Sequence, residues 1–434
     1  NITVGMHDLT QNLDLVDKIL RHVWPTLGPL ISSCQTHSMF ITNHGLYMCH
    51  YNKWDADIRP LERPGEFRRI ELEGVLSIAC GLKHNMVLTR DGLFGFGYSD
   101  DGQLGLGPAT IVGKPMSIRI DDVRHVSCGL FHTMILTRKH LFACGSDEKG
   151  QLGIPYFTST MRKPKSTFPR RVPIENVLSV TCGANYTMVL TNDGLFGCGD
   201  NSNGQLGLGD RKDRKELTRV PVENVLSIAC GLHHTFIMTS DGLFVCGDNT
   251  YGQLGLGDTE TRMSPTRSAV VKVISFAVGT NHSVILTEGD VLYVCGDNQH
   301  GQLGLGPDAY ANKNVTPTIL RLKGVLSLAC GGDQTFVVTQ DNVVAFGSNE
   351  YGQLGLVDTV DQPIPRPIPL QFGHENILVM SPVTERHDKM LRFDASLCTR
   401  CNKRASFTEP FQKRYLFCGD DCYTRYFAAL QYTQ

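Results

Sequence analysis

The sequence lacks an excess of charge of either sign. Its 434 residues contain 41 Lys and Arg against 43 Asp and Glu, which gives a formal net charge of −2 with histidine neutral. A near-neutral chain has no general electrostatic attraction for nucleic acid or for an anionic membrane. Contact with nucleic acid therefore stays an open question at this stage.

Long hydrophobic runs are absent too. No apolar segment approaches the roughly 18 residues that a membrane-spanning helix needs, so we expect no membrane partner. The central part of the chain also lacks a sustained 3.6-residue period, which argues against a repeat built of strands and helices.

What the sequence has is repetition. The tetrapeptide Gly-Gln-Leu-Gly occurs six times, starting at Gly102, Gly150, Gly204, Gly252, Gly301 and Gly352. Successive copies start 48, 54, 48, 49 and 51 residues apart. A period of roughly 50 residues is typical of an array of small units that bury surface only against their neighbours.

Each unit also predicts a β-hairpin. In one unit, apolar stretches flank the pair Asp241-Gly242, and this dipeptide is typical of a type I′ turn, which needs positive φ at both central positions. We expect seven hairpin turns, at His44-Gly45, Asp91-Gly92, Lys139-His140, Asp193-Gly194, Asp241-Gly242, Gly289-Asp290 and Asp341-Asn342.

Two hairpin strands and two strands in the variable stretch fit the length of a unit. Seven such units predict an all-β fold, a seven-bladed β-propeller over residues 29–382, with an open solenoid as the alternative. Residues 375–380 copy the strand openers at 175–178 and 223–226 but lead into no hairpin. We expect this spare strand to pair with N-terminal material and close the ring.

The motif carries a resemblance to a known family. The pattern Cys-Gly-x-x-His-Thr, Leu-Thr-x-Asp-Gly, Cys-Gly-x-Asn/Asp and Gly-Gln-Leu-Gly-Leu-Gly, best seen from Cys230 to Gly257, resembles the regulator of chromosome condensation repeat. The resemblance covers about residues 30 to 382 and implies a seven-bladed propeller. Members of the family include the guanine-nucleotide exchange factor for the small GTPase Ran, while others are interaction platforms. Fold therefore does not fix function.

Recurring cysteines and histidines follow the repeat. Five cysteines share one register (Cys80, Cys128, Cys182, Cys230, Cys330) and five share another (Cys49, Cys144, Cys198, Cys246, Cys295). Val278, Phe96 and Phe346 fill these registers elsewhere, which indicates buried free thiols rather than disulfides and favours an intracellular, reducing compartment. His84, His132, His234 and His282 align with Tyr186 and Gln334, so we expect structural hydrogen bonds there rather than catalysis or metal binding.

The repetition fails in the C-terminal tail, residues 383–434. It contains Cys398, Cys401, Cys418 and Cys422, and such pairs suit one tetrahedral Zn²⁺. The tail resembles small four-cysteine fingers of the Phe-Cys-Ser type and predicts a treble-clef-like module. Four cysteine ligands leave no open position, so the zinc would be structural. Two unmetallated thiol pairs, or a disulfide, are the alternatives.

The repetition also fails between Pro155 and Pro173. This stretch carries Arg162, Lys163, Lys165, Arg170 and Arg171 without an acid. We expect a projecting basic loop that contacts an acidic partner or a phosphate backbone; a merely solvated loop is the alternative.

The third departure is the N-terminal segment, residues 1–28. Its residues 8–23 predict an amphipathic helix, with Leu9, Leu13, Val16 and Leu20 on one face. This helix either caps the ring or docks on a second chain.

Nothing in the sequence resembles a nucleophile–base pair, paired carboxylates or an open metal site. The sequence thus favours a non-enzymatic protein-interaction scaffold with a structural zinc finger. The alternatives are an exchange factor for a Ran-like small GTPase that docks on chromatin or DNA, and an assembly protein that self-associates.

Overall fold

The computed structural model describes residues 31–42, 44–50, 65–155, 164–309 and 313–368, all within the compact unit Pro25–Val379. Three expected elements lie outside the described residues: the N-terminal helix, the spare strand at 375–380 and the four-cysteine tail. Among the residues described, no helix is long and apolar enough to cross a membrane.

The described residues form seven sheets of four strands each, and in every sheet strands that follow one another in the chain are antiparallel neighbours. We number these blades from the N-terminus. Blade 1 comprises β1 (Ile31–Ser33), β2 (His37–Thr42), β3 (Gly45–His50) and β4 (Phe67–Ile70), and blade 2 comprises β5 (Val75–Cys80), β6 (His84–Thr89), β7 (Gly92–Tyr98) and β8 (Ile111–Ile118). Blade 3 comprises β9 (Val123–Cys128), β10 (His132–Thr137), β11 (Leu141–Ser146) and β12 (Lys165–Arg171), and blade 4 comprises β13 (Val177–Cys182), β14 (Tyr186–Thr191), β15 (Gly194–Gly199) and β16 (Arg214–Arg219). Blades 5 to 7 comprise β17 (Val225–Cys230), β18 (His234–Thr239), β19 (Gly242–Gly247) and β20 (Arg262–Arg267); β21 (Val273–Val278), β22 (His282–Thr287), β23 (Val291–Gly296) and β24 (Asn314–Leu320); β25 (Val325–Cys330), β26 (Gln334–Thr339), β27 (Val343–Gly347) and β28 (Gln362–Pro367). A 3₁₀ turn, η1 (Pro307–Ala309), precedes β24.

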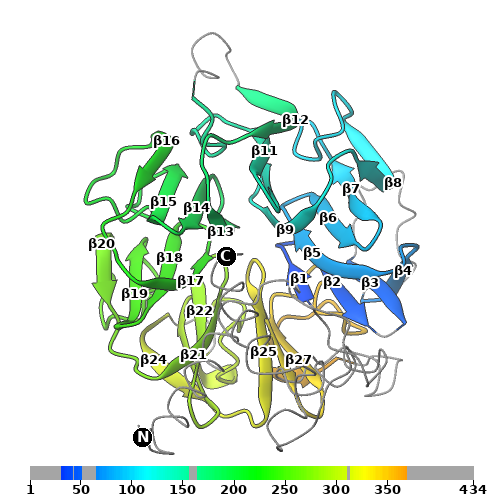
Figure 1. Cartoon of the computed structure of the whole chain (residues 1–434). Coiled ribbons are helices and arrows are strands. Elements are labelled where there is room, and N and C mark those ends of the chain that lie inside the picture. The colour runs from blue at the N-terminus through cyan, green and yellow to red at the C-terminus, as the bar shows by residue number, and fades with distance from the viewer. Residues whose placement is uncertain (1–30, 43, 51–64, 156–163, 310–312, 369–434) are drawn as a thin grey trace, which may run out of the picture. The chain divides into compact units, whose positions relative to one another are not determined.

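The seven blades close into a ring, which confirms the predicted seven-bladed β-propeller. The first strand of every blade faces the centre (Figure 1), and each contacts the first strand of the next blade. The contacts include β1 with β25, so the last blade meets the first. At this seam the rings of Phe40 and Phe336 pack edge to face, with centroids 5.6 Å apart.

Closure does not need the spare strand that the sequence predicted. All four strands of blade 1 come from residues 31–70, including its inner strand β1. Packing between complete blades closes the ring instead: Ile31, Phe40 and Cys49 of blade 1 share one buried apolar cluster with Phe336 and Leu354 of blade 7. The pairing of residues 375–380 with N-terminal material stays a prediction, because these residues lie outside the described part of the chain.

The hairpins lie where the sequence predicted them, but the turn type was wrong at the Asp-Gly pairs. Thr89 pairs with Gly92, so Arg90 and Asp91 form the two-residue loop, and neither has positive φ. Gly92 is already the first residue of β7, with φ of 135°. The Thr89 hydroxyl accepts a hydrogen bond from the Asp91 N–H at 3.1 Å and donates to the Gly92 carbonyl at 3.1 Å, so it stabilises this alternative turn.

The recurring histidine, threonine and glutamine form one hydrogen-bonded joint between successive blades. His132 Nε2 lies 3.0 Å from the hydroxyl of Thr187 on the next blade. Thr187 in turn donates to the carbonyl oxygen of Gln151 at 2.8 Å, and Gln151 belongs to a Gly-Gln-Leu-Gly segment. Since the hydroxyl proton goes to that carbonyl, His132 must donate from Nε2, which fixes its tautomer.

The same joint recurs around the ring. The other histidine–hydroxyl pairs are His84 with Thr133 at 3.0 Å, His234 with Ser283 at 3.1 Å and His282 with Thr335 at 2.9 Å. Tyr186 replaces histidine in blade 4 and its hydroxyl accepts from Thr235 at 3.0 Å. The structural interpretation of these residues is therefore confirmed.

The Gly-Gln-Leu-Gly segment supplies the carbonyl oxygen that accepts the hydroxyl proton in these joints. Its first and last glycines have positive φ, for example 82° at Gly102 and 68° at Gly105, which allows a tight turn that few other residues adopt. Its leucine is buried in every copy, with Leu104 fully inaccessible. Repetition of Gly-Gln-Leu-Gly thus follows from the need to hold one blade to the next.

Burial keeps the joint histidines neutral. It lowers the pKa of His84, His132 and His282 to about 3 and that of His234 to about 4. The Nδ1 atoms of these four rings have no hydrogen-bond partner among the described residues, so nothing there stabilises a second proton.

This predicts a steep loss of stability in acid. Below pH 6.5 the unfolded chain binds a proton at each of these histidines while the folded chain does not. Each histidine therefore lowers the free energy of unfolding by about 1.4 kcal/mol per pH unit as the pH falls from about 6.5 toward the folded pKa. Gln334 occupies the equivalent position in blade 7, so His282→Gln should fold. It should reduce the dependence of the free energy of unfolding on pH by the contribution of one histidine.

The measurement is urea unfolding of the full chain between pH 7 and 4.5. His44→Gln, at an exposed position, is the matched control and should keep the original slope. An unchanged slope in His282→Gln would show that this imidazole is not held neutral.

Candidate interaction face and axial cavity

The structure describes three of the five predicted basic residues. Arg162, Lys163 and the four tail cysteines lie outside the described residues. Lys165, Arg170 and Arg171 do not lie in a loop: they belong to β12, the outermost strand of blade 3. The predicted loop is therefore wrong for these three residues, because β12 pairs with β11 from Lys165 to Arg171.

Lys165 and Arg171 have defined contacts within the propeller. Lys165 Nζ donates to the backbone oxygen of Asp100 at 2.6 Å. Arg171 forms an ion pair with Glu175, four residues later, and Arg69 and Arg219 form equivalent pairs with Glu73 and Glu223 in blades 1 and 4. The position of Arg171 thus belongs to the repeat rather than to a special basic site.

One face of the propeller collects the loops that follow the first and third strands of each blade. Both kinds of loop lie at the same end of an up-and-down sheet, because each strand reverses the chain direction. We call this the axial face. The six Gly-Gln-Leu-Gly segments all lie in its longer loops.

The axial face is rich in acidic residues. Its described bases are only Lys83, Lys149, Arg211, Lys212 and Lys313. Its described acids are Glu66, Asp100, Asp101, Asp147, Glu148, Asp200, Asp210, Asp213, Asp248, Asp258, Glu260, Asp297, Asp308, Asp333, Glu350, Asp358 and Asp361. The chain's near-neutral total therefore hides an uneven distribution of charge.

Some of these acids have structural roles. Asp210 and Asp258 pair with Arg214 and Arg262 of the following outer strands at 2.8 and 2.6 Å. The hydrogen bond from that arginine holds the pKa of each carboxyl below its usual value. By contrast, Asp100, Glu148, Asp308 and Glu350 are exposed and have no side-chain hydrogen bond or ion pair among the described residues. These four, together with the exposed Glu66, are carboxylates that a partner can reach.

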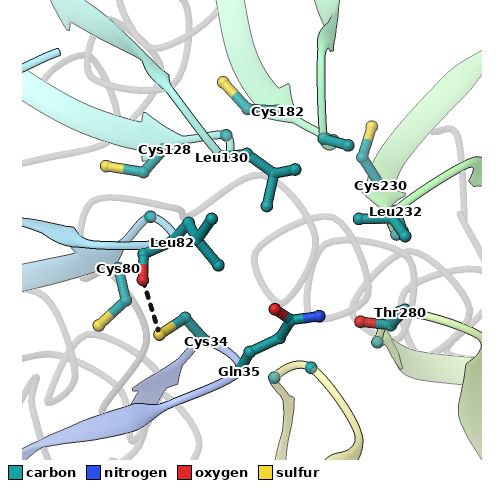
Figure 2. A pocket seen from close by; sticks show the side chains of 18 of the residues that line it. Cys34, Gln35, Cys80, Leu82, Cys128, Leu130, Cys182, Cys230, Leu232 and Thr280 are labelled. Atoms are coloured by element: carbon teal, nitrogen blue, oxygen red, sulfur yellow. Dashed lines mark hydrogen bonds between the residues drawn. The ribbon is translucent and has the colours of Figure 1, made fainter. Parts of the chain in front are cut away.

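A cavity of about 140 Å³ opens on the propeller axis within this face (Figure 2). Every blade contributes the end of its inner strand and the two residues that follow. The residues nearest the centre include Leu82, Leu130 and Leu232 on one side and Gln35 and Thr280 on the other. The cavity wall is therefore apolar on one side and polar on the other.

Cysteines at the ends of the inner strands surround this cavity but do not offer their thiols to it. Cys128 donates to the Ala79 carbonyl at 3.6 Å and Cys182 to the Ser127 carbonyl at 3.4 Å, in each case on the preceding blade. In Figure 2 the sulfurs of Cys128 and Cys182 lie away from the centre. Burial raises the pKa of Cys182 and Cys330 to about 12, which keeps these thiols protonated and unreactive.

All eleven cysteines that the structure describes are free. The prediction of unbridged cysteines is therefore confirmed for this part of the chain. The same residues contain no group of three or more His, Cys, Asp or Glu side chains arranged to hold a metal ion.

Asp147 is a buried exception in the loop of blade 3. It occupies the position of Asn201, whose amide accepts from the Leu206 N–H and donates to the Asp210 carbonyl. Asp147 accepts from the Leu152 N–H at 3.0 Å through Oδ1, while its buried Oδ2 has no partner among the described residues. Burial raises the pKa of Asp147 to about 6, although the Leu152 N–H and Lys215 lower it in part.

The fold and the axial face together define a closed propeller of the kind that carries protein-interaction surfaces. Comparison with known proteins gives the family. The RCC1-like domain matches residues 22–321, and the regulator of chromosome condensation (RCC1) repeat matches residues 340–380. The chain therefore belongs to the RCC1-like family, a protein-interaction fold.

The chain aligns with only part of the length of each of these curated relatives. Human protein RCC2 is 30% identical over 213 residues, which cover 42% of this chain and 41% of that protein. The mouse X-linked retinitis pigmentosa GTPase regulator is 36% identical over 191 residues, 42% of this chain but 14% of that protein. The aligned part of the chain thus spans about two fifths of the length of RCC2, or less for the other relative.

Solved structures show the same fold. Human WBSCR16 superposes with a TM-score of 0.63 at 25% identity and covers 70% of this chain and 85% of that chain. Prp20p from Saccharomyces cerevisiae superposes with a TM-score of 0.67 at 21% identity, over 82% of this chain and 89% of that one.

The asparagine at the other blades suggests how to repair the Asp147 position. Asp147→Asn supplies an amide that can both accept and donate, and it removes a carboxylate that is buried in its charged form above pH 6. We expect the free energy of unfolding at pH 7.5 to rise by roughly 1–3 kcal/mol. The gain should shrink as the pH falls through 6 toward 4, where the native carboxyl binds its proton.

Chemical denaturation at pH 7.5 and 4.5 measures both quantities. The reciprocal substitution Asn201→Asp is the matched control and should lower stability at pH 7.5. A gain in Asp147→Asn that is equal at the two pH values would contradict the assignment of a destabilising charge.

Proposed function

We propose that this chain is a non-enzymatic protein-interaction scaffold whose axial face binds a basic surface of a protein partner. The observation that carries the proposal is the concentration of acidic residues on that face, including Asp100, Glu148 and Glu350, which are exposed and have no side-chain partner among the described residues. The blade joints hold these side chains on a rigid ring. A face of one charge sign speeds encounter with an oppositely charged surface and disfavours partners of the same sign.

The basic residues Arg162 and Lys163 belong to the chain segment between β11 and β12. We propose that they add a contact of opposite sign for an acidic group on the partner or for a phosphate backbone. Lys165, Arg170 and Arg171 contribute less, because Lys165 and Arg171 already have partners on the propeller.

The test compares charge reversals on the two faces of the ring. The triple variant Asp100→Lys, Glu148→Lys and Glu350→Lys changes the axial face, and Asp91→Lys, Asp193→Lys and Asp341→Lys makes the same charge change in exposed hairpin turns of the opposite face. Partners captured by the unaltered chain from its native source are identified, and their binding to each purified variant is measured at several salt concentrations. We expect the axial variant to bind the main partner at least about tenfold more weakly, with a smaller salt dependence, and the control to bind normally.

A partner that binds the axial variant normally, or that only the control variant loses, would contradict the proposal. Both variants keep every blade joint, so circular dichroism and thermal unfolding should show folded protein in each case.

A second candidate function is regulation of nucleotide exchange on a small GTPase. It is supported by the family membership and by the name of the mouse GTPase regulator that matches 42% of this chain. Release of a fluorescent guanine nucleotide from purified Ran, with and without the full chain, tests this function. No acceleration at micromolar concentrations of the chain would remove it.

Self-association is the third candidate. Size-exclusion chromatography with light scattering decides it, because a monomer at working concentration contradicts an assembly role.

We propose that the tail holds one structural zinc ion through Cys398, Cys401, Cys418 and Cys422. The support is their spacing, since each close pair can present two thiolates to one metal. The buried free thiols of the propeller support our further proposal of an intracellular, reducing compartment.

Metal analysis of the full chain should give one zinc per molecule. Cys401→Ser should lower that content clearly, while Cys230→Val should leave it unchanged, because valine occupies the equivalent propeller position at Val278. Less than one zinc per chain in the unaltered protein would contradict the zinc proposal.

A further inference from the structure

Blade 1 departs from the repeat at one position beside the axial cavity. In the other six blades a glycine follows the inner strand: Gly81, Gly129, Gly183, Gly231, Gly279 and Gly331. A Cβ atom at Gly81 would lie 2.0 Å from His84 Cε1 and 2.7 Å from the Gly129 carbonyl, so the position has no room for a side chain. In blade 1 the residue three before the joint histidine is Cys34 instead of glycine.

This cysteine meets the joint histidine of its own blade. Cys34 Sγ lies 3.0 Å from His37 Nδ1. On the other side of the imidazole, His37 Nε2 lies 2.6 Å from Asn85 Oδ1 on blade 2. The amide oxygen can only accept, so Nε2 donates to it and Nδ1 is left to share a proton with the thiol.

Asn85 is itself a departure from the repeat. The equivalent joint residues are threonine or serine: Thr133, Thr187, Thr235, Ser283 and Thr335. The amide oxygen of asparagine lies one bond further from the backbone than a threonine hydroxyl, so it reaches the imidazole and orients it. Cys34, His37 and Asn85 thus form one chain of contacts, and two of them, Cys34 and Asn85, replace the residues that the other blades have at these positions.

The surroundings favour the charged form of this pair. Burial by itself would raise the pKa of Cys34, but the charge of His37 and hydrogen bonds from His37 and the Thr36 backbone outweigh it and lower that pKa. Burial opposes the charge of His37 as well, yet the contact with Cys34 raises its pKa well above the usual value. Among the described thiols this contrasts with Cys144, whose pKa burial raises to about 12.

Cys34 also lies in the wall of the axial cavity, between Leu82 and Gln35 (Figure 2). The side chain is largely buried, and its sulfur lies 3.7 Å from both the Leu82 carbonyl oxygen and the Thr36 hydroxyl. The cavity has a volume of about 140 Å³, so only a small solute fits beside this wall.

We propose that Cys34 is a redox modification site, a thiolate held by His37 and Asn85 that small hydroperoxides oxidise through the axial cavity. The sulfur attacks the nearer peroxide oxygen, so an S–O bond forms and the O–O bond breaks. Sulfur is oxidised by two electrons to a sulfenic acid, and the peroxide is reduced to an alcohol or water. The departing oxygen takes the proton from His37 Nδ1.

The site lies at the seam of the ring, so its modification has a structural consequence. Gln334 of blade 7 donates to the Cys34 carbonyl, and its Nε2 lies 2.7 Å from the Ser33 hydroxyl. Oxidation adds an oxygen atom in a place where the other blades tolerate no side chain. It should therefore weaken the contact between the first and last blades and with it the axial face.

The test measures reactivity thiol by thiol in the full chain. Iodoacetamide labelling is followed by peptide mass spectrometry between pH 5.5 and 9, and dimedone traps sulfenic acid after one equivalent of hydrogen peroxide. A free cysteine with a pKa of about 8.5 is only a few per cent thiolate at pH 7, so we expect Cys34 to be alkylated roughly tenfold faster there than an unstructured cysteine peptide. The midpoint of its pH profile should lie below that of the peptide, and dimedone should label Cys34 ahead of every other propeller thiol.

Two substitutions taken from the other blades serve as matched variants. His37→Gln, the residue found at Gln334, should move the midpoint upward to that of the peptide or beyond and abolish the peroxide reaction. Asn85→Thr restores the residue of the other joints, keeps His37 and should slow alkylation severalfold, so a result remains even where His37→Gln does not fold. Cys182→Ala, which removes another thiol of the cavity wall, is the control and should leave Cys34 unchanged.

A Cys34 that reacts no faster than the peptide, or that reacts only when the chain unfolds, would overturn the proposal. So would a pH profile that is the same in the unaltered chain and in Asn85→Thr.

Discussion

The whole propeller depends on the buried hydrogen-bonded joint between successive blades. A four-stranded sheet of this size cannot bury its apolar faces alone, so each blade must be held in register against the next. The imidazole N–H of one blade, the hydroxyl of the next and the carbonyl of Gly-Gln-Leu-Gly accomplish this with fully buried groups. The imidazoles of His84, His132, His234 and His282 are buried and their Nδ1 atoms have no partner among the described residues, so these joints also make the ring sensitive to acid.

The joint also determines the chemistry of the axis. Each histidine ring lies against the glycine that follows the inner strand, which excludes side chains there and turns the flanking cysteines toward the preceding blade. Their thiols are therefore shielded and unreactive. Cys34 differs because its blade replaces that glycine, and the imidazole that elsewhere only links blades then faces a sulfur atom.

Function is best understood as a division between a rigid frame and its loops. The frame repeats, and family membership explains it. The loops of the axial face do not repeat in charge, and their carboxylates give the ring a side that suits a basic partner. The chain's near-zero net charge concealed this, since the bases lie mostly on outer strands and outside these loops. The expected basic loop is wrong for Lys165 to Arg171 because these residues form β12, and the charge pattern of a segment does not reveal strand pairing.

The sequence alone determined the all-β class, the seven units, the hairpin positions and the unbridged state of the propeller cysteines, because all of these repeat with a period that short-range chemistry enforces. It also located every hairpin, but at the Asp-Gly pairs it placed the turn one residue too late, since the threonine hydroxyl that stabilises the turn acts through space. Only the tertiary structure decided how the ring closes, which face is acidic and that Cys34, His37 and Asn85 meet. The physical reason is that these features depend on contacts between neighbouring blades, such as Asn85 reaching across from blade 2, and such contacts join residues with no signature in the local sequence.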